Sequence, residues 1–196
     1  MDEIREAKRT ARNDITGQIK EMPEEERNEK YRQIRNRLFE FANFMEARIP
    51  LLYMNYGCEF PTKEILSHCY ALHKVVVLPL FGRDKFSYKL LKIDNPAKDL
   101  KPEGPRGVSE PNPKRCKAVP IDKLDIALIP CVALDEKGSR LGSGDGHYDR
   151  LIPKMSVTTR KVAVAMECQI LPQIPLESHD KHVDIIITEE RIIYKI

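Results

Sequence analysis

The segment "LLYMNYGCEFPTKEILSHCYALHKVVVLPL", residues 51–80, decides the fold class. Residues 51–54 and 75–80 are short apolar runs of the kind that form buried strands. Between them, residues 62–73 favour a helix, and Thr62 stands where a helix N-cap is expected. A strand, a helix and a second strand in this order predict a right-handed βαβ unit, and therefore a parallel sheet.

Further apolar runs extend the predicted sheet. Residues 86–93 alternate enough to form a strand, and residues 126–134, 162–166 and 183–188 are typical of buried strands. Residues 95–113 hold five prolines and two glycines without any period. We expect a long loop without secondary structure there, and loops of that length in compact domains are usually functional or disordered.

The polar N-terminal segment, residues 3–46, predicts a pair of helices. Apolar residues recur at steps of three and four in the first half, at Ile4, Ala7, Ala11, Ile15 and Ile19. Pro23, followed by three glutamates, favours a second helix start. That helix would turn inward Tyr31, Ile34, Leu38, Phe41 and either Phe44 or Met45. Without a repeat or a break in composition, we expect one α/β domain, with a mainly parallel sheet flanked by helices over residues 48–196.

The overall composition narrows the class of partner. The chain has 33 basic and 30 acidic residues among 196, a formal net charge of +3 at pH 7. This balance favours neither nucleic acid nor a membrane surface, whereas a small anionic ligand needs only a local cluster of positive charge. No apolar run approaches the roughly 20 residues of a membrane span, and the charged N-terminus lacks the apolar core of a signal peptide.

The cysteines indicate the compartment. Five cysteines at irregular spacing, with no CxxC pair, are typical of free thiols in a reducing cytoplasm. We therefore expect a cytoplasmic protein. In the absence of an obvious amphipathic surplus for an interface, a monomer is the default.

Four of the nine glycines fall within "GSRLGSGDGHYDR", residues 138–150. Gly138 suits a tight turn, and a glycine at every second position from 142 to 146 leads into a possible helix at 147–154. Such a loop points several backbone N–H groups at one place, which predicts an anion site. The alternative is a hairpin and helix cap that use glycine for geometry alone. His147 and the absence of a Gly-Lys-Ser/Thr run exclude the GxGxxG and P-loop motifs.

Asp149 adds a carboxylate three residues after the last of these glycines. It stands where Mg²⁺ accompanying a polyphosphate would sit, since Mg²⁺ prefers oxygen ligands. The alternative is an ordinary carboxylate in the first turn of a helix, opposing the dipole.

Several stretches together resemble one known family. "LIPCVALDEKGSRLGSGDGHYDRLI", residues 128–152, closely resembles the signature of the 5-formyltetrahydrofolate cyclo-ligase (methenyltetrahydrofolate synthetase) family. Four other segments resemble that family in the same order: "AKRTAR", "CEFPTKEIL", "GVSEP" and "QILPQIPLESHDKHVDIIITEE". The resemblance covers nearly the whole chain.

This resemblance implies a fold and a reaction. The fold would be the compact α/β type shared with sugar-phosphate isomerases and CoA transferases. In the reaction, ATP with Mg²⁺ phosphorylates the formyl oxygen of 5-formyltetrahydrofolate, a reduced folate. N10 then attacks the activated carbon, and phosphate leaves to give 5,10-methenyltetrahydrofolate.

The resemblance also implies site residues. Lys8 and Arg12, which share one helix face at i and i+4, would hold ATP phosphates, although a solvated basic face is the alternative. Arg140 and Tyr148 would be the catalytic residues. The full set implied to bind ATP is Lys8, Arg12, Arg140, Gly142, Ser143, Gly144, Asp145, Gly146, His147 and Tyr148.

On the folate side, the resemblance implies that Glu59 anchors the pterin and that Tyr148 borders the formyl group. A carboxylate can pair with two ring N–H donors at once; the alternatives are a residue that caps the following helix and a half-buried packing tyrosine. Asp149 and Asp184 would lie near Mg²⁺. For His179 and His182, in the loop before the last predicted strand, we expect a structural role.

Three departures from the family pattern keep other functions open. His147 replaces a tyrosine, Asp145 places a carboxylate within the proposed phosphate loop, and Pro61 stands where the family has an acid. One alternative is an enzyme with the same fold and phosphate site but another substrate. The other is a folate-binding or nucleotide-binding protein without turnover.

Overall fold

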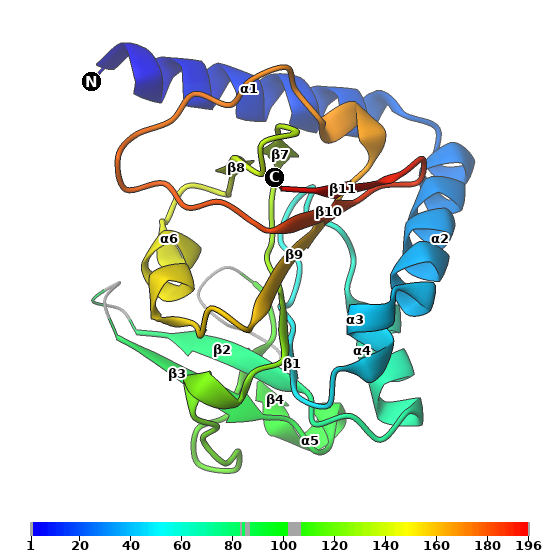
Figure 1. Cartoon of the computed structure of the whole chain (residues 1–196), viewed down its shortest axis with the longest axis vertical. Coiled ribbons are helices and arrows are strands. Elements are labelled where there is room, and N and C mark those ends of the chain that lie inside the picture. The colour runs from blue at the N-terminus through cyan, green and yellow to red at the C-terminus, as the bar shows by residue number, and fades with distance from the viewer. Residues whose placement is uncertain (1, 83, 85–86, 102–106, 196) are drawn as a thin grey trace.

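A mostly parallel sheet forms the centre of the computed structural model, which describes residues 2–82, 84, 87–101 and 107–195 (Figure 1). Within those residues the main sheet has seven strands in the order β11-β10-β9-β6-β1-β2-β3. The strands are β1 (Pro50–Leu51), β2 (Val77–Phe81), β3 (Tyr88–Lys92), β6 (Ile126–Leu128), β9 (Arg160–Val164), β10 (Ile185–Ile187) and β11 (Ile192–Tyr194). The five central strands run parallel, and β3 and β11 pair antiparallel at the two edges. The predicted α/β class with a mainly parallel sheet is confirmed.

The direction of winding reverses beside β1. From β1 the chain continues to β2 on one side, whereas β6 pairs with β1 on its other side, Pro50 opposite Ile126. At such a reversal the connections leave in opposite directions, which opens a crevice at the carboxyl ends of the strands. Ligands of open α/β sheets bind in that crevice, so the topology places a binding site after β1 and β6.

Both faces of the sheet are buried, as parallel strands require. Ile126 and Leu128 of β6 pack in one apolar cluster, whereas Ala127 packs in another on the opposite face. The first cluster is covered by α1 (Asp2–Glu21), α2 (Glu24–Glu40), α3 (Ala42–Glu46) and α4 (Lys63–Ala71). The second is covered by α6 (His147–Leu151) and the 3₁₀ turns at Ile121–Lys123 and Ile152–Lys154. Another 3₁₀ turn, Glu167–Gln169, follows β9.

The N-terminal helices match the prediction except at the end of the second. Helix α2 starts directly after Pro23 and ends at Glu40; the backbone of Phe41 is extended, and α3 follows. This interruption resets the helical phase. Of the two alternatives predicted for the last inward residue, Phe44 is therefore fully buried, whereas Met45 is 57% exposed.

One predicted strand is divided in the structure, and the predicted N-cap residue of α4 makes a different hydrogen bond from the one expected. The run 126–134 is not one strand, because β6 ends at Leu128 and Pro130 follows, which has no N–H to donate. The end of that run, β7 (Ala133–Leu134), pairs instead with β8 (Arg140–Leu141) in a hairpin. Its turn places Gly138 at a φ of 80°, as predicted. Thr62 occupies the N-cap position of α4, as predicted, but its hydroxyl makes no capping hydrogen bond and donates instead to the carbonyl of Tyr53.

The proline-rich stretch 95–113 has more structure than expected. It contains α5 (Pro96–Asp99) and two short paired strands, β4 (Leu100–Lys101) and β5 (Glu110–Pro111). Asp99 accepts hydrogen bonds from the backbone N–H groups of Asp94 and Asn95, which ties down the start of the stretch. Residues 102–106 lie outside the described residues.

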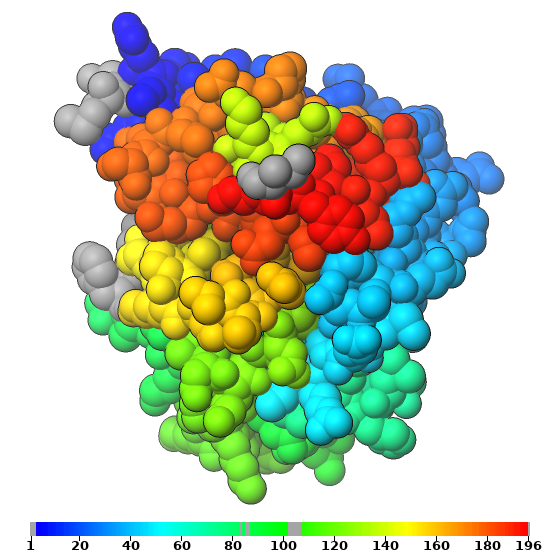
Figure 2. All heavy atoms as spheres, viewed as in Figure 1, coloured from blue at the N-terminus to red at the C-terminus, as the bar shows by residue number. Residues whose placement is uncertain are grey.

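The C-terminal strands lie on one outer face of the molecule. Figure 2 shows β11 (red) on this face, with α2 (light blue) on one side and the segment after β9 (orange) on the other.

Among the helices that the structure describes, none combines the length and the apolar composition that crossing a membrane requires. All five cysteines are free thiols, as predicted.

A stacked pair of rings joins α2 to α4 and predicts a pH dependence. Phe39 lies parallel to His68, with ring centroids 3.7 Å apart. Burial lowers the pKa of His68, and Lys74 lowers it further. The folded protein therefore binds this proton less readily than the unfolded chain, so stability is lost as the pH falls below about 6.5.

We expect the free energy of unfolding to fall more steeply between about pH 7 and about pH 5 in the wild type than in His68→Phe. The phenylalanine keeps the stack but cannot be protonated, and every other titrating group is common to both proteins. Urea denaturation at the two pH values measures the difference. Equal slopes would contradict the prediction.

Candidate active site

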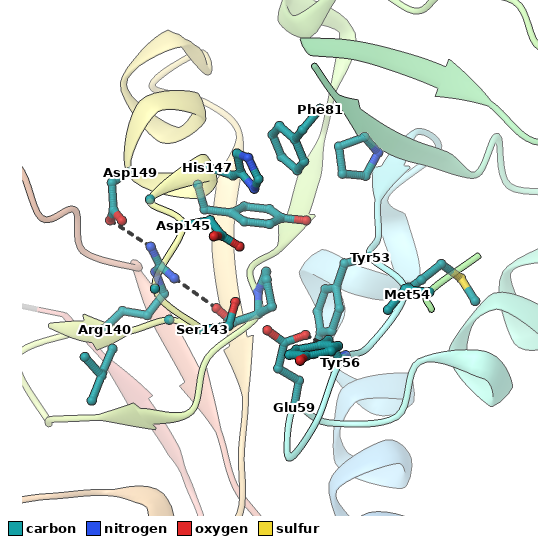
Figure 3. Close-up of a pocket in the computed structure, with 18 of the residues that line it drawn as sticks. Tyr53, Met54, Tyr56, Glu59, Phe81, Arg140, Ser143, Asp145, His147 and Asp149 are labelled. Atoms are coloured by element: carbon teal, nitrogen blue, oxygen red, sulfur yellow. Dashed lines mark hydrogen bonds and ion pairs between the residues drawn. The ribbon is translucent and has the colours of Figure 1, made fainter. Parts of the chain in front are cut away.

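A cavity of about 680 Å³ opens at the carboxyl ends of β1, β2 and β6 (Figure 3). Its walls come from α1, from the loop after β1, from the end of β2, from residues 108–111, from the glycine-rich segment and from residues 177–180. It lies at the reversal of winding beside β1, where the topology predicts a ligand. Every residue that the resemblance implies for ATP or folate lines this one cavity, and so does Asp149.

Two positions in the loop, 142 and 144, require glycine for different physical reasons. A Cβ atom on Gly142 would lie 2.5 Å from the Nη1 atom of Arg140, so only glycine lets that guanidinium pack beneath the loop. Gly144 has a φ of 115°, and a Cβ there would meet no atom within 4 Å. One glycine thus makes room for an arginine, and the other leaves backbone uncovered at the cavity.

Arg140 is held rigidly. Its side chain is 3% exposed, its Nη2 donates to Asp149 Oδ1 over 2.7 Å, and its Nη1 donates to the carbonyl of Pro130 over 3.1 Å. Asp149 Oδ1 also accepts the backbone N–H of Lys181 over 3.2 Å. The Nε atom of Arg140 is buried without a hydrogen-bond partner among the described residues. The guanidinium is therefore a fixed positive charge whose hydrogen bonding is incomplete.

Arg12 brings a second positive charge to the same cavity. Its Nε donates to the carbonyl of Gly142 over 2.8 Å, which ties α1 to the loop. Burial lowers the pKa of Arg12, Asp180 opposes this shift, and the nearby charge of Arg140 adds to it. Two guanidinium groups close enough to repel each other are stabilised by an anion bound between them. Helix α6 has only five residues, so these side chains, more than its dipole, make the loop attractive to an anion.

The opposite wall is aromatic and carries a buried carboxylate. Glu59 is 6% exposed, and its Oε2 accepts the backbone N–H of Tyr56 over 2.9 Å. Phe81 stacks on His147 with centroids 4.4 Å apart and meets Tyr148 edge-on at 5.5 Å. Figure 3 shows the Glu59 side chain beside Tyr56, with its carboxylate directed into the cavity. A carboxylate set among aromatic rings suits a flat heterocycle with adjacent N–H donors.

The Tyr148 phenol is kept protonated. Burial raises its pKa strongly, the negative charge of Glu59 raises it further, and Arg140 opposes both. A phenol with a raised pKa cannot serve as a base near neutral pH. Its O–H group remains available as a hydrogen-bond donor toward the cavity.

The expected pairing of Asp149 with Asp184 is not found. Asp184 does not line the cavity: its Oδ2 accepts the backbone N–H of Lys161 on β9 over 2.9 Å and lies 3.5 Å from the Lys161 ammonium. Asp180 lines the cavity instead, next to the Lys181 N–H that bonds Asp149. "HDKHVD" holds two aspartates four residues apart, and no feature of the sequence tells which one faces the cavity.

The cavity includes residues that sequence reasoning missed, namely Tyr53, Tyr56, Phe81, Glu177 and Asp180. Tyr53 and Phe81 lie at the ends of predicted parallel strands, and that position was a usable signal, because ligands bind at the carboxyl ends of such strands. Glu177 and Asp180 carried no comparable signal. His179, for which a structural role was expected, also lines the cavity with a 65% exposed side chain.

His182 remains outside the cavity, and its Nδ1 is buried without a partner within the described part of the chain. Over that same part, no three His, Cys, Asp or Glu side chains gather in a way that could hold a metal ion. A metal at this site would therefore depend on ligand oxygens supplied by a bound substrate.

Comparison with known proteins identifies the family. The model of the 5-formyltetrahydrofolate cyclo-ligase family matches residues 4–189. The 5-formyltetrahydrofolate cyclo-ligase of Escherichia coli (strain K12) is 25% identical over 169 residues, which cover 86% of this chain and 92% of that protein. That of Mycolicibacterium smegmatis is 36% identical over 85 residues, which cover 43% of this chain and 44% of that protein.

A solved structure of a related enzyme has the same fold as this chain. The NMR structure of Aquifex aeolicus 5,10-methenyltetrahydrofolate synthetase matches with a TM-score of 0.82 at 26% identity, covering 96% of this chain and 92% of that one. The fold, the cavity and the signature sequence all agree with this family, and the match extends over nearly the entire chain. The chain therefore belongs to the 5-formyltetrahydrofolate cyclo-ligase family of enzymes.

Proposed function

We propose that this enzyme converts 5-formyltetrahydrofolate and ATP into 5,10-methenyltetrahydrofolate, ADP and phosphate. The observation that carries the proposal is the two-sided cavity. Fixed arginines and an open glycine loop form one wall, and an aromatic slot with a buried carboxylate forms the other. A reaction between a polyphosphate and a pterin needs both walls within reach of each other.

The triphosphate would lie against the glycine loop. Arg12 and Arg140 neutralise its charge, and the uncovered backbone around Gly144 offers N–H donors. Because Asp149 and Pro130 hold Arg140 in place, the guanidinium needs no reorganisation when charge develops during phosphoryl transfer. We assign Arg140 as a catalytic residue on this ground.

The pterin would enter the aromatic slot. The Glu59 carboxylate accepts two adjacent N–H groups of the ring, and Tyr148 donates its O–H toward the formyl group. The protonated phenol suits this role, because the formyl oxygen and the phosphate that it becomes are both acceptors.

The chemistry then follows from positioning. The formyl oxygen attacks the terminal phosphorus as ADP leaves, which turns a poor leaving group into a phosphate. N10 attacks the formyl carbon, the C–O bond breaks, phosphate departs, and N10 loses its proton. The residues that line the cavity align the two substrates and neutralise charge, and no covalent enzyme intermediate is needed.

Asp149 and Asp180 would hold the Mg²⁺ that accompanies ATP. Both line the cavity, and the Lys181 N–H bonded to Asp149 brings their segments together. Two carboxylates, completed by phosphate oxygens and water, are a common Mg²⁺ environment in nucleotide sites, where the ion neutralises phosphate charge. This assignment replaces Asp184 with Asp180.

The composition of the chain supports a proposal about its partners, its oligomeric state and its location. The near-neutral net charge gives no reason to add a nucleic-acid or membrane partner. We propose a monomer that acts in the cytoplasm, where the five free thiols stay reduced. Gel filtration with light scattering tests the oligomeric state.

Purified protein mixed with 5-formyltetrahydrofolate and Mg-ATP tests the reaction. We expect the absorbance band of the methenyl product to grow, and to be absent in a control without ATP. ATP binding without the band would contradict the cyclo-ligase reaction. It would favour another substrate or a binding protein without turnover, the alternatives suggested by Asp145 and His147.

Gly142→Ala is expected to lower kcat/KM in this assay roughly tenfold, because the new Cβ displaces the Arg140 guanidinium from beneath the loop. Gly17→Ala is the matched control, since a Cβ there meets no atom within 4 Å on the exposed side of α1. The prediction fails if both variants keep wild-type rates.

A further inference from the structure

Lys8 is bound to carboxylates in the structure, although it lines the phosphate side of the cavity. Its Nζ lies 2.9 Å from Glu177 Oε2 and 2.5 Å from Asp180 Oδ2, and its side chain is only 9% exposed. These bonds join α1 to the segment after β9, which lie side by side in Figures 1 and 2. An ammonium that faces an anion site is thus already neutralised.

Without Mg²⁺, the two acids also oppose an incoming polyphosphate. Glu177 and Asp180 carry two negative charges against the single charge of Lys8, and Arg5 approaches Glu177 only to 3.9 Å with a 68% exposed side chain. His179 lies 3.9 Å from Glu177 and 3.7 Å from Asp180, too far for a hydrogen bond.

We propose that Glu177 is a positioning residue that competes with the nucleotide for Lys8. It holds the ammonium while the site lacks ATP and releases it to a phosphate oxygen when ATP binds. The inference rests on the proposed function, because the competing anion is the triphosphate of ATP. Glu177 thereby lowers the affinity for free polyphosphate and keeps Lys8 ordered between catalytic cycles.

The local geometry permits this exchange without unfolding the segment. The backbone N–H of Glu177 donates to Asp180 Oδ2 over 2.7 Å, so the turn at 177–180 is held by a bond that does not involve the Glu177 side chain. An ammonium has three hydrogens, and two of them are directed at carboxylates here. The third can engage a phosphate oxygen first, so that Lys8 never passes through an unpaired state.

Titration calorimetry with Mg²⁺-free ATP and with inorganic tripolyphosphate tests the proposal, since neither probe needs turnover. Glu177→Gln is expected to bind both about tenfold more tightly than the wild type, which corresponds to about 1.4 kcal/mol. Glu6→Gln, an equal change of charge two residues from Lys8 on the exposed face of α1, is expected to change neither affinity.

Lys8→Met separates competition for Lys8 from a general effect of charge. If Glu177 acts through Lys8, Glu177→Gln gives no gain in the Lys8→Met background. A gain that persists there, or an affinity in Glu177→Gln that is unchanged or weaker, overturns the inference and leaves the proposed function intact as long as the wild type binds ATP. Absence of ATP binding in every variant overturns both.

Discussion

Arg140→Met is expected to lower kcat/KM for methenyl formation about a thousandfold, the upper end of the range seen when one preorganised group that stabilises developing charge is removed. The substitution deletes the fixed cation of the phosphate wall and removes the ion-pair partner of Asp149. Initial rates at saturating Mg-ATP and 5-formyltetrahydrofolate measure the effect. We expect most of it in kcat, because the charge matters most in the transition state.

Two further variants make this result specific. Arg140→Lys keeps the charge but cannot reach both Asp149 and the Pro130 carbonyl, so an intermediate rate is expected. Arg191→Met removes an exposed arginine that pairs with Glu167 away from the cavity and should retain wild-type activity. A folded Arg140→Met protein with activity within tenfold of the wild type would refute the catalytic assignment.

Glu59→Gln is expected to lower kcat/KM for 5-formyltetrahydrofolate about a hundredfold, with little change in KM for ATP. A carboxylate accepts two N–H groups, whereas an amide turns an N–H₂ toward one of them and loses the charge-assisted bonds. The amide oxygen can still accept the Tyr56 N–H, so the loop should stay folded. Separate saturation curves for the two substrates measure the effect.

The control for Glu59 is Glu64→Gln, which removes an exposed charge from α4 next to the same loop. It is expected to leave both KM values unchanged. An equal rise of both KM values in Glu59→Gln would mean that the loop, and not the pterin contact, had been disturbed.

The sheet was predictable because buried parallel strands are short and uniformly apolar. The run at 75–80 and the run at 162–166 both coincide with strands, although the boundaries shift by up to two residues. The prediction of a single strand over residues 126–134 was wrong, because an apolar run alone does not distinguish a central strand from a hairpin strand. The sequence could not decide between Phe44 and Met45 as the inward residue for a related reason: the break at Phe41 changes the helical phase, and no glycine or proline marks it.

The residues of one cavity wall could be predicted from the sequence, whereas those of the other wall could not. The glycine loop was visible because its glycines are dense and lead into Tyr148 and Asp149. The aromatic wall was hidden, since Tyr53 and Phe81 look like ordinary core residues until the winding of the sheet is known. The partner of Lys8 was equally invisible, because Glu177 is 169 residues away along the chain.

The reversal of winding beside β1 has a consequence for folding. The cavity exists only where β1, with its neighbour β2, meets β6, so a chain in which either half of the sheet is unfolded has no complete binding site. Substrate must therefore bind the native state alone, and it shifts the folding equilibrium of the whole domain by mass action. At a hundredfold excess over its Kd, a substrate would add about 2.7 kcal/mol to the free energy of unfolding.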